Sequence, residues 1–311
     1  MANQVSNVGM LDTNALVKLL NKSIDLVFMR RDEVAGNVTA PFFDKVTKDS
    51  GLTHVMSSAG SSLPLPVENE DTEALPYVAP VTGFDKTFVL VNYRSGIRVT
   101  STILKADRFS RVMQMTTGQL KSGLRKDEYM RVAILDNSFS GTAGADAKAL
   151  CADSHPHENP DAGTWDNLGT GALTGPNLHA LRLLARKMTN DQGYPDPVLP
   201  MTLLVPPEQE RTALELTGEG MGKPETSLNE ANVLLPKFTV TVSPYLSSTT
   251  AYWLIGDRQG YDRGLTEVVL EDWNIKDNSP ANADIVLDKR IKAIKAFGFT
   301  TSKNCYGSPG T

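Results

Sequence analysis

The feature that most limits how this chain can fold is a long stretch, residues 51–84, with no sustained helical period. Its apolar fragments are interrupted by a glycine and four prolines, and it carries a group of acidic side chains: Gly60, Pro64, Pro66, Pro76, Pro80, Glu68, Glu70, Asp71 and Glu73. Structureless connections longer than about 15 residues are uncommon inside compact domains and are usually functional loops or partner-binding extensions. A plain surface loop is the alternative. Because residues 86–100 then follow a strand pattern, we expect a projecting β-hairpin.

Helical patterns lie on both sides of this stretch. Asp12 precedes apolar residues at three- and four-residue steps that end near Gly36, which predicts an amphipathic helix packed either on its own core or on a neighbour. A second helix is predicted from Asp107 to about Asn137, and at about 1.5 Å per residue it is roughly 45 Å long. Its expected apolar face carries Phe109, Met113, Thr116, Leu120, Met130 and Ile134, with Arg111, Lys121, Arg125 and Glu128 largely off that face.

The second half of the chain mixes one clear helix with short strands. Thr174, Gly175 and Pro176 are a typical helix start, followed by an apolar stripe through Leu178, Leu181, Leu184 and Met188. Strand patterns lie at 203–205, 238–242, 252–255, 268–270, 285–287 and 291–299, with a short helix at 208–216. No repeat period is visible, so the sequence predicts a mixed α+β fold.

Charge and composition exclude several classes of protein. The net charge is −5, and the 31 Lys and Arg residues are spread without a basic block, so the chain alone is not expected to grip nucleic acid. No stretch reaches about 18 apolar residues, and no basic segment precedes an apolar run at the start, so we expect neither a membrane span nor a signal peptide. Cys151 and Cys305 have no metal-site spacing, which indicates a reducing compartment.

Motifs that carry chemistry are weak throughout. His155 and His157 could share a metal, but only His54 and His179 remain as further histidines, and neither lies in a ligand motif, so we interpret the segment as a polar loop. The glycines at 169, 171 and 175 are spaced wrongly for a dinucleotide loop, and Pro224 after Gly222-Lys223 excludes a phosphate loop. Hydrolase motifs are also missing. We therefore expect no catalytic, cofactor-binding or metal-binding residues.

One string of residues resembles a known family. It comprises Ser154-His155-Pro156, Gly163, Asn167-Leu168, Ala172-Leu173-Thr174, Asn177-Leu178, Ala180, Arg182, Asp191, Gly193, Leu203-Leu204-Val205-Pro206-Pro207, Ala213, Val242-Ser243-Pro244-Tyr245-Leu246 and Ala251-Tyr252-Trp253-Leu254. In order and spacing, over roughly 100 residues, these pieces resemble the major head subunits of Mu-like tailed phages, which have the Hong Kong 97-type capsid fold. No charged helical scaffold segment precedes the predicted arm, so a scaffold would be a separate protein or dispensable.

The resemblance implies a domain layout and a function. The layout is an N-terminal arm at 1–50, an extended hairpin or E-loop at 51–98, a peripheral domain at 99–144 and 266–311 with its spine helix at about 107–137, and an axial domain with a central sheet at 145–265. The implied function is that of a major capsid protein, not an enzyme, which assembles through hexamers and pentamers into an icosahedral shell around DNA. The implied partners are many copies of itself, with scaffold, portal and decoration proteins, in a virion assembled in the bacterial cytoplasm.

Two alternatives remain at this stage. The first is an encapsulin-like shell protein of the same fold, which DNA or a cargo enzyme inside purified particles would distinguish. The second is a metal-dependent hydrolase that uses the loop with His155 and His157, for which a stoichiometric transition metal is expected.

Overall fold

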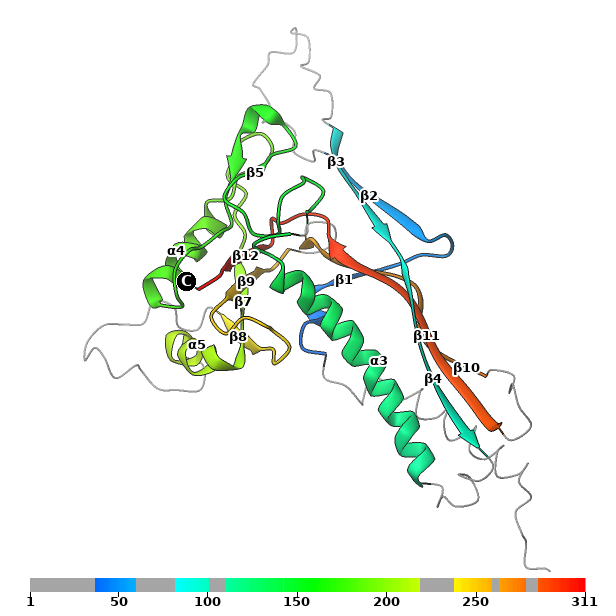
Figure 1. Cartoon of the computed structure of the whole chain (residues 1–311). Helices are drawn as coiled ribbons and strands as arrows, with labels where there is room; N and C mark the ends of the chain where they lie inside the picture. Colours follow the sequence, from blue (N-terminus) through cyan, green and yellow to red (C-terminus); the bar gives the residue numbers. More distant parts are fainter. Residues whose placement is uncertain are drawn as a thin grey trace, which may run out of the picture. The chain divides into compact units, whose positions relative to one another are not determined.

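The computed structural model of the chain describes residues 37–59, 82–100, 110–141, 143–218, 238–258, 263–277 and 285–310 (Figure 1). Contacts divide the chain into two compact units. The described part of the smaller unit comes from Val91–Asp127 and Glu271–Lys295, and the larger unit from Asn37–Leu90, Glu128–Leu270 and Ala296–Thr311. The predicted N-terminal helix and the tip of the predicted hairpin lie outside the described residues.

The described part of the smaller unit is built from segments of three strands and a helix. Strand β4 (Val91–Thr100) pairs antiparallel with β11 (Ile285–Phe299), opposite Lys295 to Ile285, while part of β10 (Leu265–Asp277) and part of α3 (Ser110–Asp136) complete the unit. Apolar side chains from alternate strand positions pack on the apolar stripe of the helix, because a strand presents every second residue to one face. The cluster consists of Leu120, Leu124, Trp273, Ile291 and Ala293, with Tyr93 against it.

A close approach between helix and strand depends on Gly123. A Cβ atom built at this position would lie 3.0 Å from the Trp273 ring, so a side chain here would push the indole away. The Trp273 Nε1–H donates to Asp127 Oδ2 at 2.9 Å, and Lys295 Nζ donates to the same oxygen at 2.7 Å. Asp127 and Lys295 are both buried. This paired charge and the indole hydrogen bond fix the helix in register on the strands.

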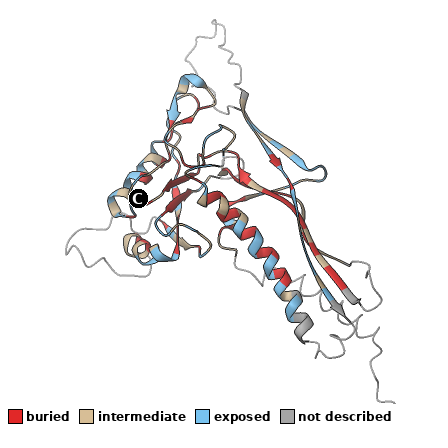
Figure 2. Ribbon diagram, viewed as in Figure 1, coloured by how far each residue is buried: buried red, intermediate tan, exposed pale blue. Residues whose placement is uncertain are grey.

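The larger unit has a four-stranded sheet with the order β12-β9-β7-β8. Strand β7 (Pro200–Val205) pairs parallel with β8 (Thr239–Val242) and antiparallel with β9 (Tyr252–Gly256), and β9 pairs antiparallel with β12 (Cys305–Ser308). Helices α4 (Gly175–Arg186) and α5 (Glu210–Thr217) bury Leu178, Leu181 and Ala213 in the core of this unit. Buried residues make up most of β7, β9 and β12, as they do one side of α3 (Figure 2).

Smaller elements complete the larger unit. A 3-10 turn (Ala40–Phe42) leads into β1 (Asp44–Thr47), which pairs parallel with β10. Strands β2 (Thr53–Ala59) and β3 (Thr82–Val89) form an antiparallel hairpin, and β5 (His155–Pro156) and β6 (Thr164–Trp165) form a minimal pair. Two further 3-10 turns span Pro160–Ala162 and Pro207–Gln209. Across the described residues, no helix is long and apolar enough to cross a membrane.

The α+β prediction and the predicted central helix agree with the structure, whereas three details are wrong. The strand pattern at 86–100 is two strands, β3 and β4, which are separated by the buried Leu90. The two strands predicted at 285–287 and 291–299 are one, β11. Strand β12 was not predicted, and it pairs with β9 at the edge of the sheet.

The place of Glu128 on the central helix is also corrected. Its side chain was expected off the apolar face, yet it is 2% exposed. Glu128 Oε1 accepts a hydrogen bond from the Thr39 N–H at 2.9 Å, and Oε2 lies 3.4 Å from Arg131 Nη1. Arg131 also pairs with Glu267 at 2.6 Å. Burial of the carboxylate is possible because a cation and a backbone donor compensate its charge.

Candidate assembly surfaces

The β2–β3 hairpin has one anchored face and one bare face. On the inner face, Phe88 is 3% exposed, and a Cβ atom on Gly298 would lie 2.8 Å from its ring. On the outer face, Val55 and Val89 are 54% and 64% exposed, and Leu52 beside the hairpin is 58% exposed. Exposed apolar side chains that lie together on a regular strand pair are typical of a surface that another chain covers.

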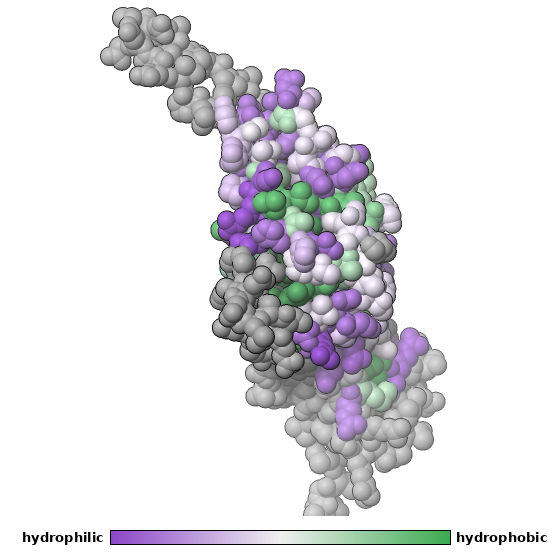
Figure 3. Space-filling view, turned by 90° about the vertical axis from the view of Figure 1, so that its left-hand side faces the viewer, coloured by the Kyte–Doolittle hydropathy of each residue, from purple (hydrophilic) through white to green (hydrophobic). Residues whose placement is uncertain are grey.

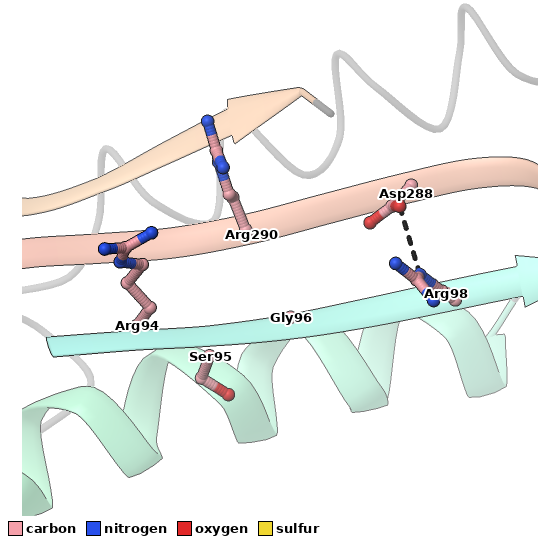
Figure 4. Close-up of a pocket in the computed structure, with 6 residues that line it drawn as sticks. All are labelled: Arg94, Ser95, Gly96, Arg98, Asp288 and Arg290. Atoms are coloured by element: carbon pink, nitrogen blue, oxygen red, sulfur yellow. Dashed lines mark hydrogen bonds and ion pairs between the residues drawn. The ribbon is translucent and has the colours of Figure 1, made fainter. Parts of the chain in front are cut away.

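A second surface feature is a hollow of about 490 Å³ over β4 and β11 in the smaller unit, which we call the arginine hollow. It is lined by Arg94, Ser95, Gly96, Arg98, Asp288 and Arg290. Figure 4 shows Arg94 and Arg290 rising from neighbouring strands on the side away from α3, while Ser95 points toward that helix. Arg98 Nε donates to Asp288 Oδ2 at 3.1 Å. The hollow is therefore lined by three guanidinium groups and one carboxylate, and Arg98 pairs with that carboxylate.

A third feature is a groove of about 340 Å³ between α4 and residues 168–171 of the larger unit. Leu183 on its rim is 41% exposed. Figure 3 shows hydrophobic residues gathered in the middle of the face that carries α4 and α5, bordered by hydrophilic ones. At the start of β7, Leu199 and Met201 are also exposed, by 45% and 56%. Apolar area of this kind favours association with another protein surface.

The two histidines of the predicted polar loop are buried, so that interpretation is wrong about their surroundings. His155 Nδ1 lies 2.6 Å from Asp146 Oδ2, and its ring stacks on Trp165 with 4.4 Å between ring centres. His157 Nδ1 lies 3.4 Å from Asp191 Oδ1. The adjacent His157 imidazole, with Lys303 adding to its effect, lowers the pKa of Asp191 from 3.8 to about 2. Each imidazole thus has its own carboxylate, and the two do not converge on one point.

Asn167 joins three segments of the larger unit. Its Nδ2 donates to the carbonyl oxygens of Leu150 and Cys305, both at 2.8 Å, and its Oδ1 accepts from the Ala152 N–H at 2.8 Å. His155 Nε2 lies 3.2 Å from the same Oδ1. The side chain is fully buried. A buried amide that satisfies backbone groups on both sides is a structural element, because each lost partner would leave a desolvated polar atom.

The structure also places the glycines and cysteines that the sequence analysis considered. Gly169 and Gly171 border the α4 groove, and Gly175 begins α4 after the N-cap Thr174, as predicted. Gly222 and Lys223 lie outside the described residues. Cys151 and Cys305 are buried free thiols, and burial raises the pKa of Cys151 well above its usual value. Over the described ranges, no group of three or more His, Cys, Asp or Glu side chains could hold a metal ion; the absence of site residues remains a prediction.

Sequence reasoning missed the arginine hollow and Asn167. Arg94, Gly96 and Arg98 do alternate along one strand, so their common face could have been read from the sequence. Arg290 and Asp288 complete the hollow from a strand about 190 residues later, and no local pattern reveals that pairing. Asn167 carried no signal beyond its place in the family resemblance.

Solved structures of other proteins have the same fold. The capsid of cyanophage P-SCSP1u matches with a TM-score of 0.51, 12% identity and 86% coverage of both chains. A Mycobacterium phage Adephagia structure matches with 0.51, 13% identity and coverage of 88% and 90%. A virus-like particle from Pyrococcus furiosus matches with 0.50, 11% identity and coverage of 93% and 98%. The chain thus has the α+β Hong Kong 97-type capsid fold.

The amino-acid sequence also shows to which protein family the chain belongs. Residues 85–303 match the family model of the phage capsid protein, and the chain belongs to that family. It is a phage capsid protein, a structural component of the virion. No curated protein matches the sequence. The predicted fold and capsid function are confirmed, while the Mu-like subfamily is not shown.

Proposed function

We propose that copies of this subunit assemble first into hexamers and pentamers, in which one surface meets a different surface on the next copy, and that the β2–β3 hairpin with residues 60–81 is the E-loop laid over a neighbour. The observation that carries the proposal is the bare outer face of this hairpin, where Val55 and Val89 are more than half exposed. Heterologous contacts of this kind close into rings. Because each subunit touches several others, modest contacts add up to a stable shell.

The finer assignments belong to the same proposal. The arm at 1–50, the peripheral domain at 99–144 and 266–311 and the axial domain at 145–265 follow the Mu-like layout, and α3 serves as its spine. The shell encloses DNA without reading its sequence, which the net charge of −5 supports, because a strongly basic wall would hold phosphate tightly. Scaffold, portal and decoration proteins are its further partners, and assembly occurs in the bacterial cytoplasm.

The two earlier alternatives receive less support. An encapsulin-like shell has the same fold, so structural likeness does not separate it from a phage capsid, but the family match favours the phage protein. The hydrolase hypothesis needs His155 and His157 on one metal. Their separate carboxylate partners, Asp146 and Asp191, argue against that arrangement.

The test replaces residues 60–80 by an Asn-Gly turn. Ala59 pairs with Thr82 in the hairpin, so a short turn can join the two strands there. We expect a folded monomer, with an unchanged circular dichroism spectrum and the sedimentation of a single subunit, that forms no shells in electron micrographs. Normal particles from this variant would overturn the E-loop assignment.

A point variant separates loss of the segment from loss of the bare face. Val55→Ser with Val89→Ser keeps the hairpin length and removes its exposed apolar area, while Phe88→Ser removes an inner-face contact and serves as the matched control. We expect the first variant to stay monomeric and as stable as the wild type. The control should instead lower the unfolding midpoint, because Phe88 is 3% exposed.

A further inference from the structure

The arginine hollow opens on the face of β4 and β11 that points away from α3. Strand register places Arg98 opposite Asp288 and Gly96 opposite Arg290, so Arg94, Arg98 and Arg290 share the strand face away from α3. Gly96 has no side chain opposite Arg290, and a Cβ atom there would be in ordinary contact with the Arg290 Cβ at 3.9 Å. All three guanidinium groups can therefore be reached from the same side.

Positive charge in the hollow exceeds negative charge. Arg98 is paired with Asp288, whose side chain is 5% exposed. Among the residues that the structure describes, neither Arg94 nor Arg290 has an acidic partner, and Arg290 Nε is shielded from solvent without a hydrogen-bond acceptor. A buried donor without a partner destabilises the subunit by itself, and a guanidinium group binds a carboxylate through two parallel hydrogen bonds. The hollow is therefore suited to two carboxylates from elsewhere.

The chain carries a matching acidic run. Glu68, Glu70, Asp71 and Glu73 lie within six positions, and no Lys or Arg occurs between Lys48 and Lys86. The run is present once for each hollow in any assembly of identical copies. Duplex DNA is the other source of anions, but it carries a charge about every 1.7 Å and is held by many cations together, whereas two arginines here lack a carboxylate and Asp288 faces the same space.

We propose that the arginine hollow of one subunit binds carboxylates of the acidic run, residues 68–73, of a neighbouring copy. The inference rests on the proposed function, because it needs the hairpin segment to reach another subunit. The contact is specific in register as well as in charge. Guanidinium forks on two strands fix both the position and the direction of an acidic segment.

The test is a charge swap in the full-length protein. Variant one is Arg94→Glu with Arg290→Glu, variant two is Glu70→Arg with Asp71→Arg, and variant three combines them. Arg94→Glu is also tested alone. Arg94 is exposed, so this variant still tests the hollow if replacement of the half-buried Arg290 harms folding. Lys121→Glu on the exposed side of α3 changes the net charge as much as Arg94→Glu alone does and is the matched control for that variant. Circular dichroism and sedimentation establish folding, and particle yield is measured by gradient centrifugation and electron microscopy.

We expect variants one and two to lower particle yield at least about tenfold, because like charges then face each other at every copy of the contact. Variant three should restore the yield to within about threefold, and Lys121→Glu should leave it unchanged. Normal yield from variants one and two would overturn the inference and leave the proposed function intact. Normal shells with less packaged nucleic acid in variant one would assign the hollow to DNA instead. Failure of the wild type to form shells under the same conditions would overturn the proposed function and this inference with it.

Discussion

Replacing Asn167 by alanine should be among the most damaging single changes in the larger unit. The substitution removes two donated hydrogen bonds, to the carbonyl oxygens of Leu150 and Cys305, and one accepted bond, from the Ala152 N–H, all of 2.8 Å. Each buried polar group left without a partner costs about 1–3 kcal/mol. Allowing for relaxation, we expect the free energy of unfolding to fall by roughly 3–5 kcal/mol.

The assay is urea unfolding of unassembled subunits, followed by the fluorescence of the buried tryptophans Trp165, Trp253 and Trp273. At a slope of about 3 kcal/mol per molar urea, the midpoint should fall by about 1 M or more. Asn177→Ala is the matched control: Asn177 Nδ2 also donates to a carbonyl oxygen, that of Ala172 at 2.9 Å, but at an exposed position. Its loss should be under about 1 kcal/mol. Equal midpoints for the two variants would refute the structural role of Asn167.

Two other predictions concern packing and pH. Gly118→Ala should stabilise α3 by up to about 1 kcal/mol, because nothing lies near the new methyl group. Gly123→Ala should not stabilise it, because its Cβ would lie 3.0 Å from Trp273. The urea midpoints of the two variants test this difference, and an equal gain in stability would contradict the close approach of Gly123 to Trp273. Because the pKa of Asp191 falls from 3.8 to about 2 on folding, with the adjacent His157 imidazole as the main cause, its stabilisation is present above pH 3.8 and is lost as the pH falls toward 2. Asp191→Asn should flatten the stability profile in that interval, and an unchanged profile from pH 4 to 2 would contradict the coupling.

Elements governed by neighbours in sequence could be predicted from the sequence. The start of α4 follows from Thr174, whose side chain accepts from the Asn177 N–H, and from the proline at 176, which tolerates the first turn. The long helix also followed from its period. In both helices the stabilising interactions join residues a few positions apart, so the local sequence pattern is enough to predict the helix.

Elements that depend on distant residues could not be predicted. Asp288 and Lys289 interrupt the apolar alternation of β11, and we predicted two strands there, yet both residues are buried within one strand. Asp288 is compensated by Arg98, 190 positions earlier. Glu128 was misplaced for the same reason, since its compensating groups include Thr39, 89 residues away. Charge compensation over such distances leaves no periodic signal in the sequence.

Because segments of the two units alternate along the chain, a subunit acquires the arginine hollow only late in its synthesis. Among the described residues, the smaller unit starts with β4; the chain then passes through Glu128–Leu270 of the larger unit and only afterwards supplies β11, with Arg98 and Asp288 190 positions apart. At about 5–20 residues per second, a ribosome needs roughly 10–40 s to cover that interval. Until then β4 has no partner strand and the arginine hollow does not exist. A nascent chain therefore cannot join a growing shell through that surface, and translation itself delays association until the subunit is nearly whole.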